Sequence, residues 1–264
     1  MTFLVLIIGL GVGLVVGLMG VGGGIVLVPA LVYLLHFGQH LAQGTSVFLL
    51  LGPTGLGALQ SYWKKGHVDV QAGLVCAGGF FIGGYFGSLA ALRIPPRDLE
   101  MIFGVFLMGS ALLLLRHRDA QPAQLIPEGA AAQQEITTKH ARARWIAIFA
   151  VACGVGVMGG LLGVGGGILL VPFLILLFRF DQHRAQGTSL VALVLPTGLL
   201  AFLNYNHAGD VSWRVGLLLI PGVFLGGILG GRLAQKLSPT LLRSVFSAFL
   251  LILGASQVFL AWRR

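Results

Sequence analysis

The residues whose types and spacing could bind a ligand are glycines, threonines, serines and glutamines that occur in two copies. GLMGVGGGIVLVP at 17–29 returns as GLLGVGGGILLVP at 160–172, with eleven of thirteen positions identical and an offset of 143 residues. Two further motifs recur at this offset: AQGTS at 42–46 and 185–189, and PTGL at 53–56 and 196–199. A glycine cluster that breaks a helix leaves N–H groups free at the next helix start, and such groups bind anions without a charged side chain. The repeated motifs therefore predict an anion site made of backbone and hydroxyl donors.

The candidate substrate-binding residues are the glycines that precede the second helix of each copy and the polar residues that follow. They are Gly22, Gly23, Gly24, Gln43, Thr45, Ser46 and Thr54, with their counterparts Gly165, Gly166, Gly167, Gln186, Thr188, Ser189 and Thr197. The Gly-Thr-Ser motif also suits a helix N-cap. Tyr62, Tyr205 and Asn204 are weaker candidates, because tyrosine is common at membrane interfaces.

A purely structural role for the same residues is the alternative. Glycine is frequent in membrane helices, and Thr or Ser hydroxyls can bond the preceding turn. The pair Gly83 and Gly87, repeated as Gly226 and Gly230, favours close helix packing over ligand binding. Since a duplication copies every residue at first, the repeat by itself does not separate the two roles.

The charged residues exclude several functions. All eight acidic residues lie at the ends of apolar runs or in loops, and no Lys or Arg lies in the middle of a run. This argues against a pump with an intramembrane carboxylate and against a cation channel with an acidic ring. It also argues against a membrane-embedded enzyme, so we expect no catalytic residues, metal site or cofactor. Of the histidines, only His40 and His183 are repeat equivalents, and proton coupling through them is a minor alternative.

The elements that carry these motifs are apolar helices. Hydrophobic residues make up 56% of the 264 residues and charged residues 9%, whereas soluble domains carry about 25% charged residues. We expect an all-α polytopic membrane protein with 8 to 10 transmembrane segments, with helices broken at the glycine clusters and kinked or ended at Pro53. The expected helices cover 3–19, 24–36, 43–62, 69–92 and 98–115, then 145–162, 167–178, 186–205, 211–232 and 239–262.

The chain divides into an N-terminal membrane repeat at 1–115, a polar linker at 116–144 and a C-terminal membrane repeat at 145–264. If each repeat crosses an odd number of times, the 17 Lys and Arg residues divide 12 to 5 between the two sides; an even number gives 10 to 7. The positive-inside rule therefore favours inverted repeats with the linker in the cytoplasm. The net charge of +9 is interpreted as topology signalling and lipid contact, with no nucleic-acid partner.

The duplicated glycine element running into a Val-Pro helix, followed by GTS and a proline-containing span, resembles the TauE/SafE family. These are sulfite-exporter-like proteins, also called the TSUP or 4-toluene sulfonate uptake permease family. The resemblance covers the chain except for 116–144. It implies a multi-pass permease of the bacterial inner membrane for a small sulfur-containing anion such as sulfite, thiosulfate or an organosulfonate.

From these observations we expect a secondary transporter that exports the anion by alternating access between the repeats, embedded in the lipid bilayer. Export of an anion from a cell that is negative inside needs no coupling ion. The alternative is a passive anion channel or a membrane subunit that serves a partner enzyme. The sequence does not specify the anion, the direction of transport, a coupling ion or the oligomeric state.

Overall fold

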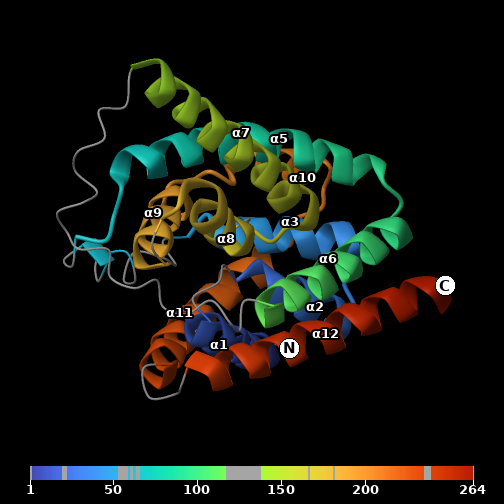
Figure 1. Ribbon diagram of the computed structural model, residues 1–264. Coiled ribbons are helices and arrows are strands. Elements are labelled where there is room, and N and C mark those ends of the chain that lie inside the picture. The colour runs from blue at the N-terminus through green and yellow to red at the C-terminus, as the bar shows by residue number, and fades with distance from the viewer. Residues whose placement is uncertain are drawn as a thin grey trace.

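A computed structural model describes residues 2–19, 23–52, 59, 62–63, 66–116, 138–165, 167–180, 182–234 and 239–263 (Figure 1). This part of the chain contains helices and no strand. The helices of the N-terminal half are α1 (Thr2–Met19), α2 (Gly24–Leu34), α3 (Gln39–Leu50), α5 (Val70–Arg93) and α6 (Pro96–Arg116). Those of the C-terminal half are α7 (Thr138–Leu162), α8 (Gly167–Phe178), α9 (Gln182–Val194), α10 (Leu199–His207), α11 (Trp213–Ala234) and α12 (Pro239–Arg263).

The predicted breaks at the glycine clusters are confirmed. Helix α1 ends at Met19 and α2 begins at Gly24, while α7 ends at Leu162 and α8 begins at Gly167. The single helix expected over 186–205 is wrong, because α9 ends before Pro196 and α10 continues at an angle of 41° to it. Proline lacks an N–H and clashes with the preceding turn, which explains this break. Helix α7 begins within the predicted linker, and most of the predicted span 43–62 beyond Leu51 lies outside the described residues.

Three helix pairs form the frame of the fold. Helices α1 and α11 run parallel, as do α5 and α7, whereas α6 and α12 run antiparallel (Figure 1). Glycines allow the parallel pairs to touch: a Cβ atom at Gly83 of α5 would lie 2.8 Å from the Val157 nitrogen of α7. Likewise, a Cβ atom at Gly226 of α11 would lie 2.8 Å from the Leu14 nitrogen of α1. The packing role expected for these glycines is therefore confirmed.

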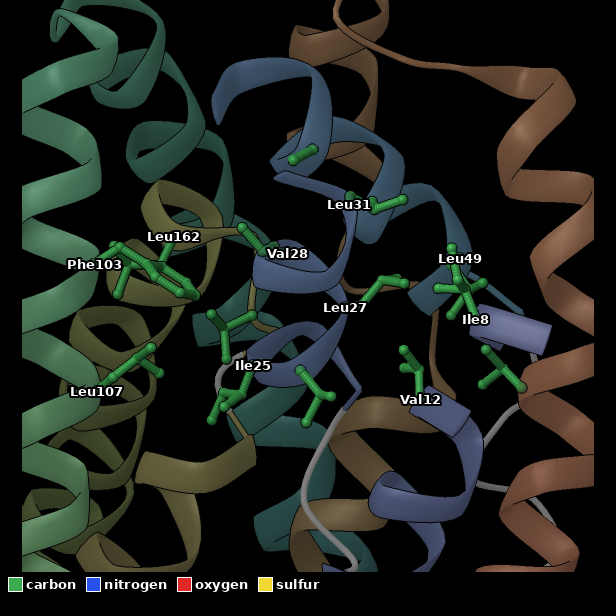
Figure 2. Packing of buried hydrophobic residues seen from close by; sticks show 14 of the residues in the cluster. Ile8, Val12, Ile25, Leu27, Val28, Leu31, Leu49, Phe103, Leu107 and Leu162 are labelled. Carbon is green, nitrogen blue, oxygen red and sulfur yellow. The ribbon is translucent and has the colours of Figure 1, made fainter. Parts of the chain in front are cut away.

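Helix α2 lies in the centre of the largest apolar cluster (Figure 2). Its side chains Ile25, Leu27, Val28 and Leu31 are each at most 1% exposed. Figure 2 shows Phe103 and Leu107 of α6 with Leu162 of α7 on one side of α2, and Ile8, Val12 and Leu49 on the other. Burial on all sides of its first half explains why this part of the helix is apolar around its whole circumference, whereas Leu34 in the last turn is exposed.

The outward surface is also apolar. Phe86, Phe224 and Ile252 are 59%, 57% and 69% exposed, and a soluble protein does not leave so much apolar surface in water. Helices α5, α7 and α11 are each long and apolar enough to cross a membrane, and the bent α9–α10 pair is a possible fourth crossing. The structure thus fits a multi-pass membrane protein, and the count of 8 to 10 segments stays a prediction.

Several local features recur at the spacing of 143 residues. His36 after α2 and Arg179 after α8 both have positive φ, at 54° and 56°. Each is followed by a phenylalanine whose N–H returns to the preceding helix: Phe37 to Leu31, and Phe180 to Leu174. Both helices therefore end in the same left-handed cap. The turns before α5 and α11 also match, with Gly66 at φ 72° and Gly209 at φ 79°.

Candidate functional site

The glycine break of the C-terminal half lies directly against the helix that follows the other break. Helix α2 starts at Gly24, where a Cβ atom would lie 2.5 Å from the Cα of Val164 and would overlap the carbonyl oxygen of Gly163. Gly23, at the N-cap of α2, offers no side-chain cap. The structure thus places Gly23 and Gly24 beside the 163–165 segment, as one backbone-lined region.

Helix α3 covers this region through a face that includes Gln43, Ser46 and Leu50. The Ser46 hydroxyl donates a hydrogen bond of 2.8 Å to the Gly163 carbonyl, and both groups are buried. A Cβ atom at Gly163 would lie 2.8 Å from the Cα of Gln43, and one at Gly165 would lie 2.7 Å from Cδ1 of Leu50. Both glycines also have φ near 70°, at 70° and 73°, so only glycine fits here without strain.

Tyr205 of α10 contacts both α3 and the end of α7, which leads into the glycine break. Its hydroxyl lies 3.0 Å from the Gly160 carbonyl oxygen and 3.2 Å from Oε1 of Gln43, and its side chain is fully buried. From the sequence, Tyr205 was a weaker candidate and a possible interfacial anchor, but in the structure its side chain is buried between α3 and α7. Gln43 is also fully buried, and its Nε2 has no hydrogen-bond partner. The site therefore holds a neutral, buried donor beside the break.

The prediction that Gly-Thr-Ser caps a helix is wrong. Helix α3 begins at Gln39 and α9 at Gln182, so the motif lies inside each helix. The N-cap position of α3 is Gly38, which makes no side-chain cap bond. The motif was placed too close to the helix start because apolar periodicity begins only after it, although the polar residues before it are already helical.

Each Gly-Thr-Ser motif instead holds the start of a helix from the other half of the chain. Thr45 Oγ1 accepts a hydrogen bond of 3.0 Å from the N–H of Ser212, just before α11, and Gly44 makes room for the Asp210 carbonyl. We call this contact the Thr45 clamp.

The second motif repeats the arrangement. Thr188 Oγ1 accepts a hydrogen bond of 3.1 Å from the N–H of Asp69, just before α5, and Gly187 makes room for the His67 carbonyl. We call this contact the Thr188 clamp. The two clamps use residues separated by 143 positions on both sides of the bond, and the Gly and Thr residues of both motifs therefore have a structural role.

Different charged groups surround the two clamps. Beside the Thr188 clamp, Arg184 forms an ion pair of 2.7 Å with Asp69. Beside the Thr45 clamp, partial burial raises the pKa of the Asp210 carboxyl above its ordinary value, and the nearby His40 opposes this shift. His40 Nε2 lies 2.9 Å from the carbonyl oxygen of Ala91 at the end of α5.

The other predicted site residues are distributed more widely. The Thr197 hydroxyl bonds the Ala192 carbonyl at 3.3 Å, within the α9–α10 break. Asn204 donates to Ser88 Oγ at 2.8 Å and so joins α10 to α5. Gly167 opens α8, and Ser189 lies buried in α9 and has an interaction partner. Three predicted residues and one predicted side chain lie outside the described part: Gly22, Thr54 and Gly166, and the side chain of Gln186.

Glu100 and Gln39 are among the buried polar residues that the sequence did not single out. Glu100 lies near the start of α6, as expected for an acidic residue, but it is only 4% exposed and has an interaction partner. Gln39, in the first turn of α3, is 1% exposed, and neither of its amide atoms has a hydrogen-bond partner. The signal for Gln39 was its counterpart Gln182, at the same offset of 143 residues. Within the described ranges, no group of three or more His, Cys, Asp or Glu residues could hold a metal ion.

Comparison with known proteins identifies relatives along the whole chain. The family model described as "Sulfite exporter TauE/SafE" matches residues 5–256. The chain is 31% identical to the probable membrane transporter protein YunE of Bacillus subtilis, over 98% of both chains. It is 33% identical to a probable membrane transporter protein of Xylella fastidiosa strain 9a5c, over 98% of this chain and 95% of the relative. No solved structure matches.

Proposed function

Because the chain belongs to the sulfite exporter TauE/SafE family of membrane transporters, we propose that it is a secondary transporter that exports a small sulfur-containing anion. The anion is sulfite, thiosulfate or an organosulfonate, and the membrane is the inner membrane. The substrate is held where Gly23 and Gly24 meet the 163–165 segment, by backbone N–H groups and by Gln43. Ser46 and Tyr205 fix the geometry of this region through their bonds to Gly163 and Gly160.

The observation that carries this proposal is the junction of the break before α8 with the start of α2, beside a buried carboxamide donor without a partner. A neutral set of donors suits an oxyanion that must be bound and then released, since a fixed positive side chain would hold it more tightly. A helix N-terminus adds a favourable partial positive charge without side-chain ionisation. Inverted-repeat transporters commonly place their substrates between such broken helices.

We infer that the two halves are inverted repeats. Helices α6 and α12 occupy equivalent places in the sequence repeat and run antiparallel in the fold, which fits a two-fold axis in the membrane plane. The matched caps at His36 and Arg179 and the two matched clamps support the same symmetry. The excess of positive residues around the predicted linker supports a cytoplasmic position for it.

This symmetry supports alternating access as the mechanism. The Thr188 clamp lies at the start of α5 and the Thr45 clamp at the start of α11, and inversion places these starts at opposite ends of the molecule (Figure 1). Release of one clamp while the other stays closed would open the central region to one side only. The membrane potential supplies about 2.3 kcal/mol per charge per 100 mV, which drives anion export without a coupling ion.

Thermal unfolding of the purified protein with a panel of anions tests the substrate class. The panel contains sulfite, thiosulfate, sulfoacetate, an aryl sulfonate, sulfate, nitrate and lactate. A ligand at 100 times its dissociation constant stabilises the folded state by about 2.7 kcal/mol, which gives a clear rise in Tm. We expect stabilisation by one of the sulfur oxyanions and none by lactate; a flat response to the whole panel would refute the proposal.

Flux into proteoliposomes tests the mechanism. We expect saturable transport with counterflow, driven by an imposed potential without a pH gradient. Flux that rises linearly with concentration and shows no counterflow would indicate a passive channel instead. Absence of flux under a potential alone would refute uncoupled export.

A further inference from the structure

Helix α3 carries two glutamines on one face, and only one of them was expected to bind a ligand. Gln39 and Gln43 are four residues apart, so their side chains lie on the same side of the helix, about 6 Å apart along its axis. Ser46 continues this face toward the 163–165 segment, where its hydroxyl bonds Gly163. The polar face therefore extends from the region of the breaks to the first turn of α3.

The glutamines differ from the other buried polar groups of the site in having free hydrogen-bonding capacity. Thr45, Thr188 and Ser46 each use the hydroxyl in a bond to the backbone. In contrast, Nε2 of Gln43 and both amide atoms of Gln39 are buried without a partner. The side chains are 0% and 1% exposed, so lipid headgroups and surface water do not explain them.

A buried amide without a partner opposes folding, and an apolar side chain of the same size would not. Gln257 of α12 also has an unpartnered Nε2, so burial alone does not indicate a ligand. The two amides of α3 differ from it in their place, on successive turns of the face that leads to the glycine breaks, where a ligand would supply the missing partners. The Tyr205 hydroxyl donates to Oε1 of Gln43, whereas the Nε2 hydrogens have no partner in the protein and are available to a ligand. N–H donors without a neighbouring positive charge bind oxyanions with moderate strength, which suits passage.

We propose that Gln39 and Gln43 line one wall of the translocation path and bind the substrate oxyanion in succession, Gln43 beside the glycine breaks and Gln39 one helical turn further out. This inference rests on the proposed function and adds a second binding position to it. Gln39 precedes His40, whose Nε2 contacts the Ala91 carbonyl at the end of α5. The path therefore leads from the glycine breaks toward the end of α5, which is the end of the molecule that carries the Thr45 clamp. Gln39 is a substrate-binding residue in this arrangement.

The test compares Gln39→Met with Gln257→Met in the full-length protein. Methionine preserves the volume of glutamine and removes the amide. Gln257 of α12 is the matched control, because it is also 1% exposed with an unpartnered Nε2 but packs against Gly104 of α6, away from the site. Two readouts are needed: Tm without added anion, and the affinity and flux measured with sodium sulfite and sodium thiosulfate.

We expect Gln39→Met to keep the Tm of the wild type or to raise it, because no protein hydrogen bond is lost. We expect the same variant to reduce anion affinity or flux by about tenfold, as loss of one hydrogen bond to an anion should do. Gln257→Met should keep both properties within about twofold of the wild type.

Two results would overturn the inference while leaving the proposed function intact. One is a lower Tm for Gln39→Met, which would show that the amide has a structural role. The other is wild-type affinity and flux in Gln39→Met. If the wild type itself neither binds nor moves a sulfur oxyanion, the proposed function fails and the inference fails with it, and the wild-type measurement separates this case from the other two.

Discussion

Replacing either clamp threonine by valine should loosen one end of the protein and not the other. Valine has the shape of threonine but cannot accept a hydrogen bond, so Thr45→Val leaves the N–H of Ser212 without its partner. Thr188→Val does the same to the N–H of Asp69. Both threonine side chains are fully buried, so water does not replace the lost acceptor without local opening.

The magnitude follows from the cost of a buried donor without a partner, about 1–3 kcal/mol. If only the closed form of each clamp carries this cost, local opening becomes about 5- to 150-fold more frequent. Hydrogen exchange of the backbone amides measures such opening directly. Thr45→Val should accelerate exchange at 212–216 and leave 69–73 unchanged, and Thr188→Val should do the reverse.

Thr197→Val is the matched control, because the Thr197 hydroxyl donates to the nearby Ala192 carbonyl of its own half and not to the start of α5 or α11 among the described residues. It should leave exchange at the starts of α5 and α11 unchanged. If Thr45→Val and Thr188→Val accelerate both ends equally, the clamps do not act separately and the alternating mechanism built on them is refuted. No acceleration at either end would show that the two hydrogen bonds do not hold these helices.

Four further substitutions test the packing and the charges. Gly44→Ala should lower Tm strongly, because the added methyl group would overlap the Asp210 carbonyl. Gly11→Ala is its control: a Cβ atom at Gly11 would meet no atom of another segment within 4 Å, so this substitution should stabilise helix α1 by about 0.5–1 kcal/mol. Burial raises the pKa of the Asp210 carboxyl above 3.8, so the folded protein binds the carboxyl proton more tightly than the unfolded chain does. The free energy of unfolding should therefore fall as the pH rises just above 3.8. A pH series of Tm should show a smaller fall in Asp210→Asn. Arg184→Gln should cost at most about 1 kcal/mol and less at high salt, because the Arg184 side chain is 50% exposed; a large, salt-independent loss in Tm would contradict this.

Helix ends were predictable from the sequence where a glycine cluster or a proline sets them. Helix α8 begins at Gly167 and α12 at Pro239, as expected, because these residue types act through the local backbone. The proline effect was underestimated once: Pro196 separates α9 from α10 completely. The starts of α3 and α9 were missed because both are polar and carry no apolar pattern.

The partners of the motif residues were not predictable from the sequence. Thr45 and Ser212 are 167 residues apart, and Tyr205 and Gln43 are 162 apart. The helices of a membrane protein are apolar on most sides, so the hydrophobic pattern does not show which side faces another helix. The sequence identified the motif, and only the fold showed that each copy of Gly-Thr-Ser holds the opposite half.

Knowledge of these partners changes which residues are the best ligand donors. From the sequence, the hydroxyls of Thr45 and Ser46 and the amide of Gln43 were equal candidates. In the fold, both hydroxyls bond the backbone, whereas the amide nitrogen of Gln43 and the whole amide of Gln39 do not bond the protein. A transport site must offer groups that can exchange partners at low cost, and groups already fixed in helix contacts do not meet this requirement. The hydroxyls therefore hold helix contacts in the central region, and under the proposed function the carboxamides of α3 are the better candidates to bind the anion.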